Sequence, residues 1–286
     1  MTQRFMTRGS RRAVGLLAGL TMIGALLPVT APWSAPAPAD AKNVDLTIYH
    51  IEQRRSFRVI WLAEELGIPY KLVFKRGDLG GSMDLIKKVN PLMPMAPTVD
   101  FRGQILVESG GILELLMANY AHGRLMPKVS SPDYSYYLQF INFAEGTGMY
   151  RIWATRYASM IAKIPVEQIP KGYHADDKDS GLVGVQAVLV YMDDFLSKHP
   201  YFGGQEFSAA DIMMHMVARS SGPTAGVDSW SYPHIAAWRK TIQDRPAFKR
   251  AIGIAFPDGA DKDQNACGMP IPFANPPAVF KCPPAA

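Results

Sequence analysis

The stretch DLTIYHIEQRRSFRVIWLAEELGIPYKLVF, residues 45–74, decides the fold of this chain. Residues 45–49 are mostly apolar and predict a short strand. From Ser56 to Leu66 the apolar side chains recur at helical spacing, and Gly67 marks the end of that helix. Residues 70–74 predict a second strand. A strand, a helix and a strand in this order are typical of a layer of helices packed on a sheet.

The same alternation continues as far as residue 123. The segments expected there are a short helix over 85–89, a hairpin formed by 97–101 and 104–107 with its turn at Arg102-Gly103, and a helix over 109–120. We therefore expect residues 44–123 to form an α/β domain, with a small mixed sheet and helices packed on it.

After Met126-Pro127 the strand signals stop and helical periodicity dominates. The expected helical segments are 133–156, 181–197, 208–220 and 232–243. A proline-marked break over 164–179 separates the first two. We expect an all-helical domain over residues 129–252.

Residues 207–212, Phe-Ser-Ala-Ala-Asp-Ile, have the pattern of a capping box. Ser208 is expected to cap the helix that follows it, and Asp211 to bond back to the amide of the cap residue. Phe207 and Ile212 would pack together as a hydrophobic staple. Capping boxes occur in many helical proteins, so the predicted role is structural.

Residues 1–41 have the pattern of a secretory signal peptide. Basic residues precede an apolar run from Ala13 to Leu27, and an Ala-Asp-Ala sequence predicts cleavage between Ala41 and Lys42. The Ser10-Arg11-Arg12 segment resembles a twin-arginine export signal. We expect a periplasmic or secreted protein. The alternative is an uncleaved signal that tethers the chain to the membrane.

The composition narrows the class of protein. With 286 residues, 48% of them hydrophobic and 19% charged, the chain can build a large core, which excludes a small disulfide scaffold and makes general disorder implausible. The leader has four arginines against one aspartate, so it carries +3 of the formal net charge of +5. The remainder is nearly neutral and shows no basic stripe, so we expect no nucleic-acid partner. The apolar run of the leader is too short to predict a stable membrane span after processing.

Both cysteines, Cys267 and Cys282, lie in a proline-rich tail over 253–286. In an oxidising compartment such a pair predicts a structural disulfide that closes the tail. The six histidines of the chain do not provide metal-ligand spacing with these cysteines, so we expect no metal site.

Several motifs occur in an order that resembles the glutathione transferases, particularly the bacterial members. They are Leu66-Gly67-Ile68-Pro69-Tyr70, Asn90-Pro91, Ala96-Pro97-Thr98-Val99, Glu108-Ser109-Gly110-Gly111-Ile112, the capping box, Trp238, and Arg245-Pro246-Ala247-Phe248. The resemblance covers roughly residues 44–252. It does not extend to the leader or the tail.

The resemblance implies a thioredoxin-like N-terminal domain followed by an all-α domain, which agrees with the pattern of strands and helices above. It implies an enzyme that conjugates the thiol of glutathione to a small hydrophobic electrophile. Glutathione would be a co-substrate, and no bound cofactor is expected. Dimerisation is common in the family, although no residue of this chain by itself demonstrates it.

The resemblance also implies a glutathione-binding site. Ala96 would pair its main chain with the extended peptide of glutathione, next to a cis bond at Pro97. Glu108 and Ser109 fall where the family binds the γ-glutamyl end. There the helix N-terminus and the serine hydroxyl can receive a carboxylate, while Glu108 would face the ammonium group.

Three residues compete for the role of activating the thiol. Tyr49 stands at the end of the first strand, as in tyrosine-type relatives, or else belongs to the core. Ser56 could donate a hydroxyl or merely cap the helix. Arg54, which with Gln53 stands where serine-type relatives carry the hydroxyl, could stabilise a thiolate by its charge or lie in a solvated turn.

Met95 stands where many relatives carry a glutathione-binding lysine, which suggests weaker binding of glutathione or a different preferred thiol. This departure, with those at Gln53 and Arg54, keeps two other functions open. One is a non-catalytic protein of the same fold that binds glutathione or a hydrophobic ligand. The other is a glutathione-dependent disulfide reductase that uses two glutathione molecules.

Overall fold

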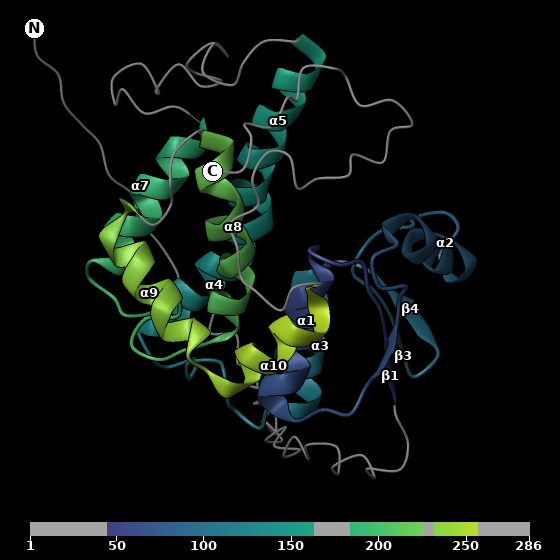
Figure 1. Cartoon of the computed structure of the whole chain (residues 1–286). Helices are drawn as coiled ribbons and strands as arrows, with labels where there is room; N and C mark the ends of the chain where they lie inside the picture. Colours follow the sequence, from purple (N-terminus) through teal and green to yellow (C-terminus); the bar gives the residue numbers. More distant parts are fainter. Residues whose placement is uncertain (1–44, 163–183, 226–230, 257–286) are drawn as a thin grey trace, which may run out of the picture. The chain divides into compact units, whose positions relative to one another are not determined.

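A four-stranded mixed sheet organises the first part of the chain. The computed structural model describes residues 45–162, 184–225 and 231–256 (Figure 1). The strands are β1 (Leu46–Tyr49), β2 (Lys71–Val73), β3 (Thr98–Phe101) and β4 (Gln104–Leu106), in the spatial order β2-β1-β3-β4. β1 runs parallel to β2 and antiparallel to β3, and β3 runs antiparallel to β4. The expected mixed sheet is confirmed.

One face of the sheet belongs to the core. Leu46 and Ile48 of β1 are completely buried, whereas Thr47 and Tyr49, which alternate with them, are half-buried. Alternate residues of a strand point to opposite faces, so the core lies on the Leu46 and Ile48 side. Helices α1 (Ser56–Leu66), α3 (Ser109–Tyr120) and α10 (Pro246–Ala255) gather beside one another (Figure 1), and both α3 and α10 contact α1.

Helix α1 has the bounds that the sequence predicts. It ends at Gly67, which adopts a left-handed conformation with φ of 70°. The amide of Ile68 then donates to the carbonyl oxygen of Ala63 over 2.9 Å, which closes the last turn. A residue with a Cβ atom rarely adopts this backbone conformation, so glycine is the natural stop here.

Helix α2 (Leu79–Val89) begins earlier than the expected helix over 85–89. Asp78 caps it, because its Oδ1 accepts a hydrogen bond of 2.7 Å from the amide of Gly81. Gly80 and Gly81 have low intrinsic helix propensity, so the sequence pattern did not predict the first turn of this helix. The cap explains why the helix forms there nevertheless.

The hairpin between β3 and β4 turns at the expected residues. Arg102 and Gly103 both have positive φ, 55° and 82°. Two such residues are typical of the tight turns that match the twist of paired strands. The carboxylate of Asp100 accepts a hydrogen bond of 2.8 Å from the Gly103 amide and supports the turn.

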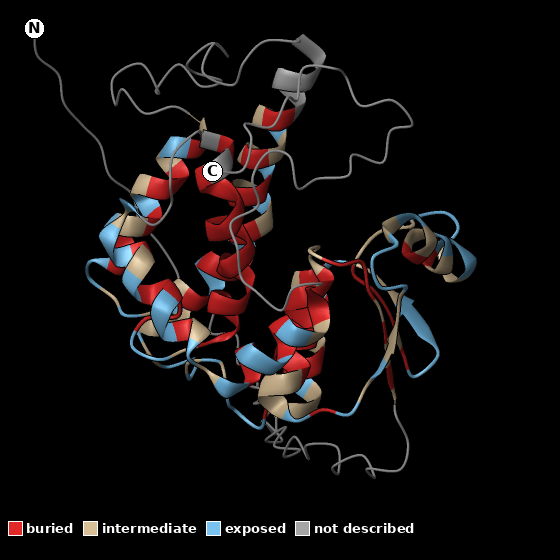
Figure 2. Cartoon of the chain, viewed as in Figure 1, coloured by how far each residue is buried: buried red, intermediate tan, exposed pale blue. Residues whose placement is uncertain are grey.

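The remainder of the described chain is helical. Its elements are α4 (Asp133–Phe143), a π-helix (Ala144–Met149), α5 (Tyr150–Ala162), α7 (Gly184–Leu196), α8 (Ala209–Ala225) and α9 (Pro233–Gln243), followed by α10. The sequence predicts one periodic segment over 133–156, but the π-helix interrupts it. Helix α10 was not predicted. Helix α8 is buried along most of its length, as Figure 2 shows, and it contacts α4, α5 and α7.

The capping box at the start of α8 is confirmed and reaches further than expected. Asp211 Oδ2 accepts from the amide of Ser208 over 2.9 Å, and Ser208 Oγ accepts from the amide of Ala210 over 3.2 Å. Asp211 Oδ1 also accepts from the amide of Phe202 and from Nε1 of Trp238, each over 2.9 Å. One buried carboxylate therefore joins α8, the loop before it and α9.

Some expectations fall beyond the described residues. The leader, the break over 164–179 and the cysteines Cys267 and Cys282 all lie outside them. Among the helices that the structure does describe, none combines the length and the apolar character needed to span a membrane.

Candidate functional site

The strand register places three connecting segments at one edge of the sheet. Tyr49, the last residue of β1, pairs with Thr98, the first residue of β3. Leu106, the last residue of β4, pairs with Val99. The segments that leave β1, enter β3 and leave β4 therefore lie close together, and they carry every substrate-binding residue that the sequence predicts.

The segment that enters β3 contains Ala96 and Pro97, and the peptide bond between them is cis, as expected. Pro97 is buried and Ala96 is half-buried. The hydroxyl of Thr98 donates to the main-chain oxygen of Met95 over 2.6 Å, which stabilises the turn that enters β3. The Met95 side chain offers no charge, so recognition at this segment would depend on the main chain.

The segment that leaves β4 ends at the N-terminus of α3. Ser109 is the first residue of that helix and is 2% exposed, whereas Glu108 before it is exposed and has a positive φ of 73°. A non-glycine residue in this conformation is uncommon and typical of functional sites. The amides at the start of α3 and its helix dipole favour an anion at this position.

The buried side chain of Arg58, on α1, holds Ser109 in position. Its side chain is completely buried, and its Nη1 donates to Ser109 Oγ over 2.9 Å. A guanidinium N–H can only donate, so the serine oxygen accepts and the serine keeps its own proton to donate to a carboxylate. Arg58 Nη2 also donates to the main-chain oxygen of Met213 over 2.8 Å, which anchors the side chain to α8.

Glu145 of the π-helix completes this network. It contacts Arg58 Nη1, and it accepts from Arg55 Nε over 2.8 Å. Burial opposes its ionisation, but Arg58 and Arg55 outweigh that effect and hold the pKa of Glu145 below its ordinary value. The helical part of the chain thus contributes a carboxylate to the candidate site of the sheet domain.

The π-helix lies close to α8 because of Gly148. A Cβ atom at this position would lie 2.7 Å and 3.0 Å from the two methyl groups of Val217. Only a residue without a side chain fits this approach without a shift. Insertions of π-helical turns into α-helices are frequent at functional sites, and this one carries Glu145.

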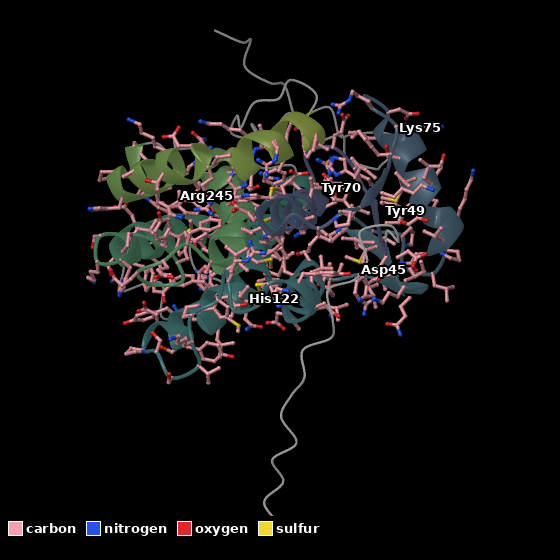
Figure 3. The ribbon with its side chains drawn as sticks, turned by 90° about the horizontal axis from the view of Figure 1, so that it is seen from below. Asp45, Tyr49, Tyr70, Lys75, His122 and Arg245 are labelled. Atoms are coloured by element: carbon pink, nitrogen blue, oxygen red, sulfur yellow. The ribbon has the colours of Figure 1, made fainter. Side chains whose placement is uncertain are left out.

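Tyr49 lies at the expected strand end but on the face of β1 opposite to Leu46 and Ile48. Burial, and then the negative charge of Asp100, raise the pKa of its hydroxyl, which therefore stays protonated. Figure 3 shows Tyr49 in the sheet domain together with Asp45 and Lys75, apart from Arg245 among the helices.

Ser56 is completely buried, and its hydroxyl is engaged inside the protein. Its Oγ lies 2.7 Å from Nδ1 of His50, whose Nε2 lies 3.1 Å from the main-chain oxygen of Ala255. A carbonyl oxygen only accepts, so Nε2 carries the imidazole proton and the serine donates to Nδ1. Burial lowers the pKa of His50 to about 4, so the ring is neutral. This geometry favours a structural role for Ser56 at the start of α1.

Arg54 remains as the charged candidate at the start of α1. It is half-buried and follows Gln53, whose positive φ of 60° turns the chain toward the helix. Burial, and then the neighbouring Arg55, lower the pKa of Arg54, although a guanidinium stays protonated near neutral pH. A nearby thiolate would relieve the cost of placing this charge here.

Sequence reasoning did not assign Arg58, Glu145 or Arg55 to the site. Arg58 interrupts an otherwise apolar run over residues 57–63 of α1, which was the available signal. Glu145 is 87 positions from Arg58 in the sequence and lies in no local motif. Within the described ranges, no three histidine, cysteine, aspartate or glutamate side chains gather as metal ligands would.

Comparisons with known proteins find relatives of both domains. Residues 44–117 match the glutathione S-transferase N-terminal domain, and residues 155–246 match the glutathione S-transferase C-terminal domain. The chain is 27% identical over 216 residues to glutathione S-transferase 3 of Schizosaccharomyces pombe, a match that covers 72% of this chain and 86% of that protein. It is 22% identical over 236 residues to glutathione S-transferase 1 of Saccharomyces cerevisiae, which covers 74% and 98%.

Solved structures share the fold. A glutathione S-transferase from Actinobacillus pleuropneumoniae superposes with a TM-score of 0.60 at 20% identity, covering 75% of this chain and 95% of that one. A theta class enzyme from Xanthomonas axonopodis pv. citri, solved with glutathione bound, superposes with a TM-score of 0.53 at 22% identity, covering 73% and 97%. The expected thioredoxin-like domain with an all-helical second domain is confirmed. The two domain matches, the relatives and the shared fold together support the assignment of this chain to the glutathione S-transferase family.

Proposed function

We propose that this protein is a glutathione transferase that conjugates the thiol of glutathione to a hydrophobic electrophile. One observation carries the proposal. Ser109 stands at the N-terminus of α3, held by the buried Arg58, at the sheet edge that also bears the Ala96–Pro97 segment and leads into α1. A carboxylate site, a main-chain segment and a cation are the three groups that binding glutathione and ionising its thiol require.

Each end of glutathione has a complementary group. The γ-glutamyl carboxylate would accept from the Ser109 hydroxyl and from amides at the start of α3. The exposed carboxylate of Glu108 would face the γ-glutamyl ammonium. The peptide portion would pair with the main chain at Ala96, as an added strand pairs with a sheet edge.

The chemistry then needs only a thiolate and a positioned electrophile. The thiol proton leaves to water, and Arg54 stabilises the sulfur anion by its charge. The sulfur attacks the electrophilic carbon and a C–S bond forms. The displaced electron pair departs with the leaving group of an aryl halide, stays on the oxygen of an opened epoxide, or forms the enolate of an unsaturated carbonyl compound, and water protonates the last two. Holding both reactants in place supplies most of the rate enhancement. Among the three candidates for thiol activation we favour Arg54. Ser56 already donates to His50, and Tyr49 lies on the face of β1 opposite to the buried Leu46 and Ile48.

Turnover by the purified full chain tests this function. We expect glutathione-dependent conjugation of at least one member of a panel of aryl halides, epoxides and unsaturated carbonyl compounds. Calorimetry with glutathione is performed beside it. Binding without turnover across the panel would favour the non-catalytic ligand-binding protein. Turnover confined to low-molecular-weight disulfides, with two glutathione molecules consumed and one glutathione disulfide formed per disulfide reduced, would favour the reductase.

We also propose that the leader directs export of the protein to the periplasm or the medium. The support is the order of the Arg11-Arg12 pair, the apolar run and the Ala39-Asp40-Ala41 site. A reporter that is active only outside the cytoplasm, fused after residue 45, should become active. A twin-lysine variant of Arg11 and Arg12 should stay silent if the twin-arginine route is used, and should remain active if ordinary export is used. Retention of the unaltered fusion inside the cell would contradict export.

A homodimer is part of the proposal, since it is typical of the family. Leu92 is 93% exposed and Met93 is 58% exposed, and adjacent apolar side chains of this kind favour a protein interface. Light scattering should give twice the chain mass. The Leu92→Asp variant should shift the equilibrium toward the monomer, and a monomeric unaltered protein would contradict the dimer.

A further inference from the structure

The segment between β1 and α1 is attached to the C-terminal end of α10. We call residues 50–55 the β1–α1 loop, and it carries Arg54, the residue that would stabilise the thiolate. His50 begins the loop and has no exposed surface, and its Nε2 lies 3.1 Å from the main-chain oxygen of Ala255. These two residues are 205 positions apart in the sequence. A helix near the far end of the chain therefore contacts the loop that would act on the sulfur.

Arg76, between β2 and α2, makes a second attachment. Its Nη2 donates to the main-chain oxygen of Ile254 over 2.8 Å, and its Nη1 contacts the main-chain oxygen of Phe256 at 3.4 Å. Nη1 also donates to Oε1 of Glu52 over 3.2 Å, and the amide of Gly77 donates to Oε2 of this carboxylate over 2.8 Å. Glu52 belongs to the β1–α1 loop and is 2% exposed. Arg76 thus joins the loop to the end of α10.

The attachment supplies what the end of a helix lacks. The last four carbonyl groups of a helix have no partner within that helix. In α10 the main-chain oxygens of Ile254 and Ala255 are among them, and they accept from Arg76 and His50 respectively. The positive charge of Arg76 also interacts favourably with the C-terminal end of the helix dipole. The end of α10 and the β1–α1 loop therefore stabilise each other.

Hydrogen bonds within the loop extend this attachment to Arg54. Nδ1 of His50 accepts from Ser56 Oγ over 2.7 Å, and the same oxygen accepts from the amide of Ile51 over 3.3 Å. The amide of Arg54 donates to the main-chain oxygen of Ile51 over 3.2 Å. Gln53 has a positive φ of 60°, a conformation that persists in a residue with a side chain only when its surroundings hold it. The main chain that carries Arg54 is thus held by contacts that lead to α10.

We propose that His50 and Arg76 are positioning residues, which use the end of α10 to hold Arg54 where it meets the sulfur of glutathione. This inference rests on the proposed function. The effect of a charge on a thiolate falls with distance, so a displaced loop would lose it. Ala96 and Ser109, which would bind the rest of glutathione, lie on other segments. Loss of the attachment should therefore lower the ionisation of the thiol without weakening the binding of protonated glutathione.

Ultraviolet titration of bound glutathione tests the inference, because a thiolate absorbs where a thiol does not. His50→Phe keeps a ring beside Phe74, whose centre lies 5.1 Å from that of His50, and removes both hydrogen bonds. At one pH the ratio of bound thiolate to bound thiol should fall about tenfold in this variant. In mild acid, where the thiol is protonated in both proteins, the affinity for glutathione should be unchanged. A weaker affinity in acid with an unaltered ratio would overturn the inference.

Two further variants separate the bond to α10 from the bond within the loop. His50→Gln can donate to the main-chain oxygen of Ala255 as Nε2 does, whereas His50→Asn can accept from Ser56 Oγ as Nδ1 does. His50→Gln should keep most of the thiolate of the unaltered protein, and His50→Asn should lose about as much as His50→Phe. The reverse order would show that α10 is not involved.

Arg250→Gln is the matched control on the same helix. Arg250 Nε donates to Oε2 of Glu64 over 2.6 Å, so the variant breaks a contact between α10 and α1 that does not include the loop. It should leave the ionisation of bound glutathione unchanged. A loss equal to that of His50→Phe would show that any weakening of α10 has this effect, and would contradict the specific role of the loop.

Hydrogen exchange keeps the inference testable if His50→Phe does not fold or if glutathione does not bind. The side chain of Arg76 is 50% exposed, so we expect Arg76→Gln to fold. The amides of Ile51 and Arg54 should exchange about tenfold faster in Arg76→Gln than in the unaltered full chain, and at the unaltered rate in Arg250→Gln.

Equal exchange in Arg76→Gln and the unaltered protein would overturn the inference, even if conjugation is observed. Faster exchange with unchanged thiol ionisation would also overturn it, because the attachment would then stabilise the loop without positioning Arg54. If the unaltered protein did not bind glutathione, the proposed function would fail. Faster exchange in Arg76→Gln would in that case still support the attachment of the loop to α10.

Discussion

Arg58 Nη1 donates to Ser109 Oγ over 2.9 Å, from a side chain with no exposed surface. The same nitrogen contacts Glu145, so the serine at the N-terminus of α3 and a carboxylate of the helical domain share one donor. The arrangement makes the geometry of the site depend on contact between the sheet domain and the helical domain. These partners also explain how the guanidinium of Arg58 is tolerated in the protein core, on the buried side of α1.

Arg58→Gln should lower the free energy of unfolding by about 3 kcal/mol, because it removes the buried partner of an ion pair, leaves Glu145 with Arg55 alone, and takes a donor from Ser109 Oγ and the main-chain oxygen of Met213. Urea denaturation measures the change. Arg250→Gln is the control: its side chain is 53% exposed and pairs with Glu64, so its loss should cost less than about 1 kcal/mol. Similar losses for the two variants would contradict the buried network.

Gly148→Ala should destabilise the protein by roughly 1 to 3 kcal/mol, since the new methyl group would meet Val217. Gly146→Ala, in the same π-helix, is the matched control, because a Cβ atom there has no neighbour within 4 Å. The control should be neutral or slightly stabilising. Thermal unfolding compares the two, and equal melting temperatures would show that the π-helix does not lie close to α8.

His50 should make stability fall in mild acid. Its folded pKa of about 4 lies below its ordinary value of 6.5, so the unfolded chain takes up a proton first as the pH falls. The contribution of His50 to the free energy of unfolding is complete above pH 6.5 and is lost as the pH falls to 4, a change of about 3 kcal/mol.

Asp211 acts in the opposite direction, because burial raises its pKa to about 6. As the pH falls, the folded protein therefore protonates Asp211 before the unfolded chain does. The free energy of unfolding that Asp211 contributes increases below pH 6. The His50 effect is therefore measured as the difference between the unaltered protein and His50→Gln, each unfolded by urea between pH 7 and 4. A difference that does not change with pH would contradict a buried neutral histidine.

Asp211→Ala should cost about 3 kcal/mol, since it removes the cap of α8 and leaves the indole N–H of Trp238 and buried amides without an acceptor. The control is Asp194→Ala, because that carboxylate is 62% exposed and pairs only at the surface with Lys198. The control should change stability by less than about 0.5 kcal/mol. A small effect at Asp211 would show that other contacts hold α8 and α9 together.

The elements with strong local signals were predictable from the sequence. Helix α1 has apolar periodicity and Gly67 as its stop, and the Arg102-Gly103 turn sets the hairpin. The first turn of α2 was hidden because Gly80 and Gly81 oppose a helix that the Asp78 cap still starts. The π-helix adds one residue to a turn without changing the apolar pattern enough to be seen.

The candidate site could be predicted only where its residues lie in local motifs. The motifs containing Ala96 and Ser109 placed them at one sheet edge because the family fixes the order of these motifs. The partnership of Arg58 and Glu145 depends on packing between distant segments, which no local pattern encodes. Ser56 looked like a hydroxyl donor, but the pattern could not show that its proton is directed to His50.

A crystal structure of the full chain with glutathione would show directly whether these residues bind it. We expect the γ-glutamyl carboxylate at Ser109 and the start of α3, the peptide portion along Ala96, and the sulfur nearer to Arg54 than to Tyr49 or Ser56. Glutathione bound elsewhere, or a sulfur in contact with the Tyr49 hydroxyl on the opposite face of β1, would contradict it.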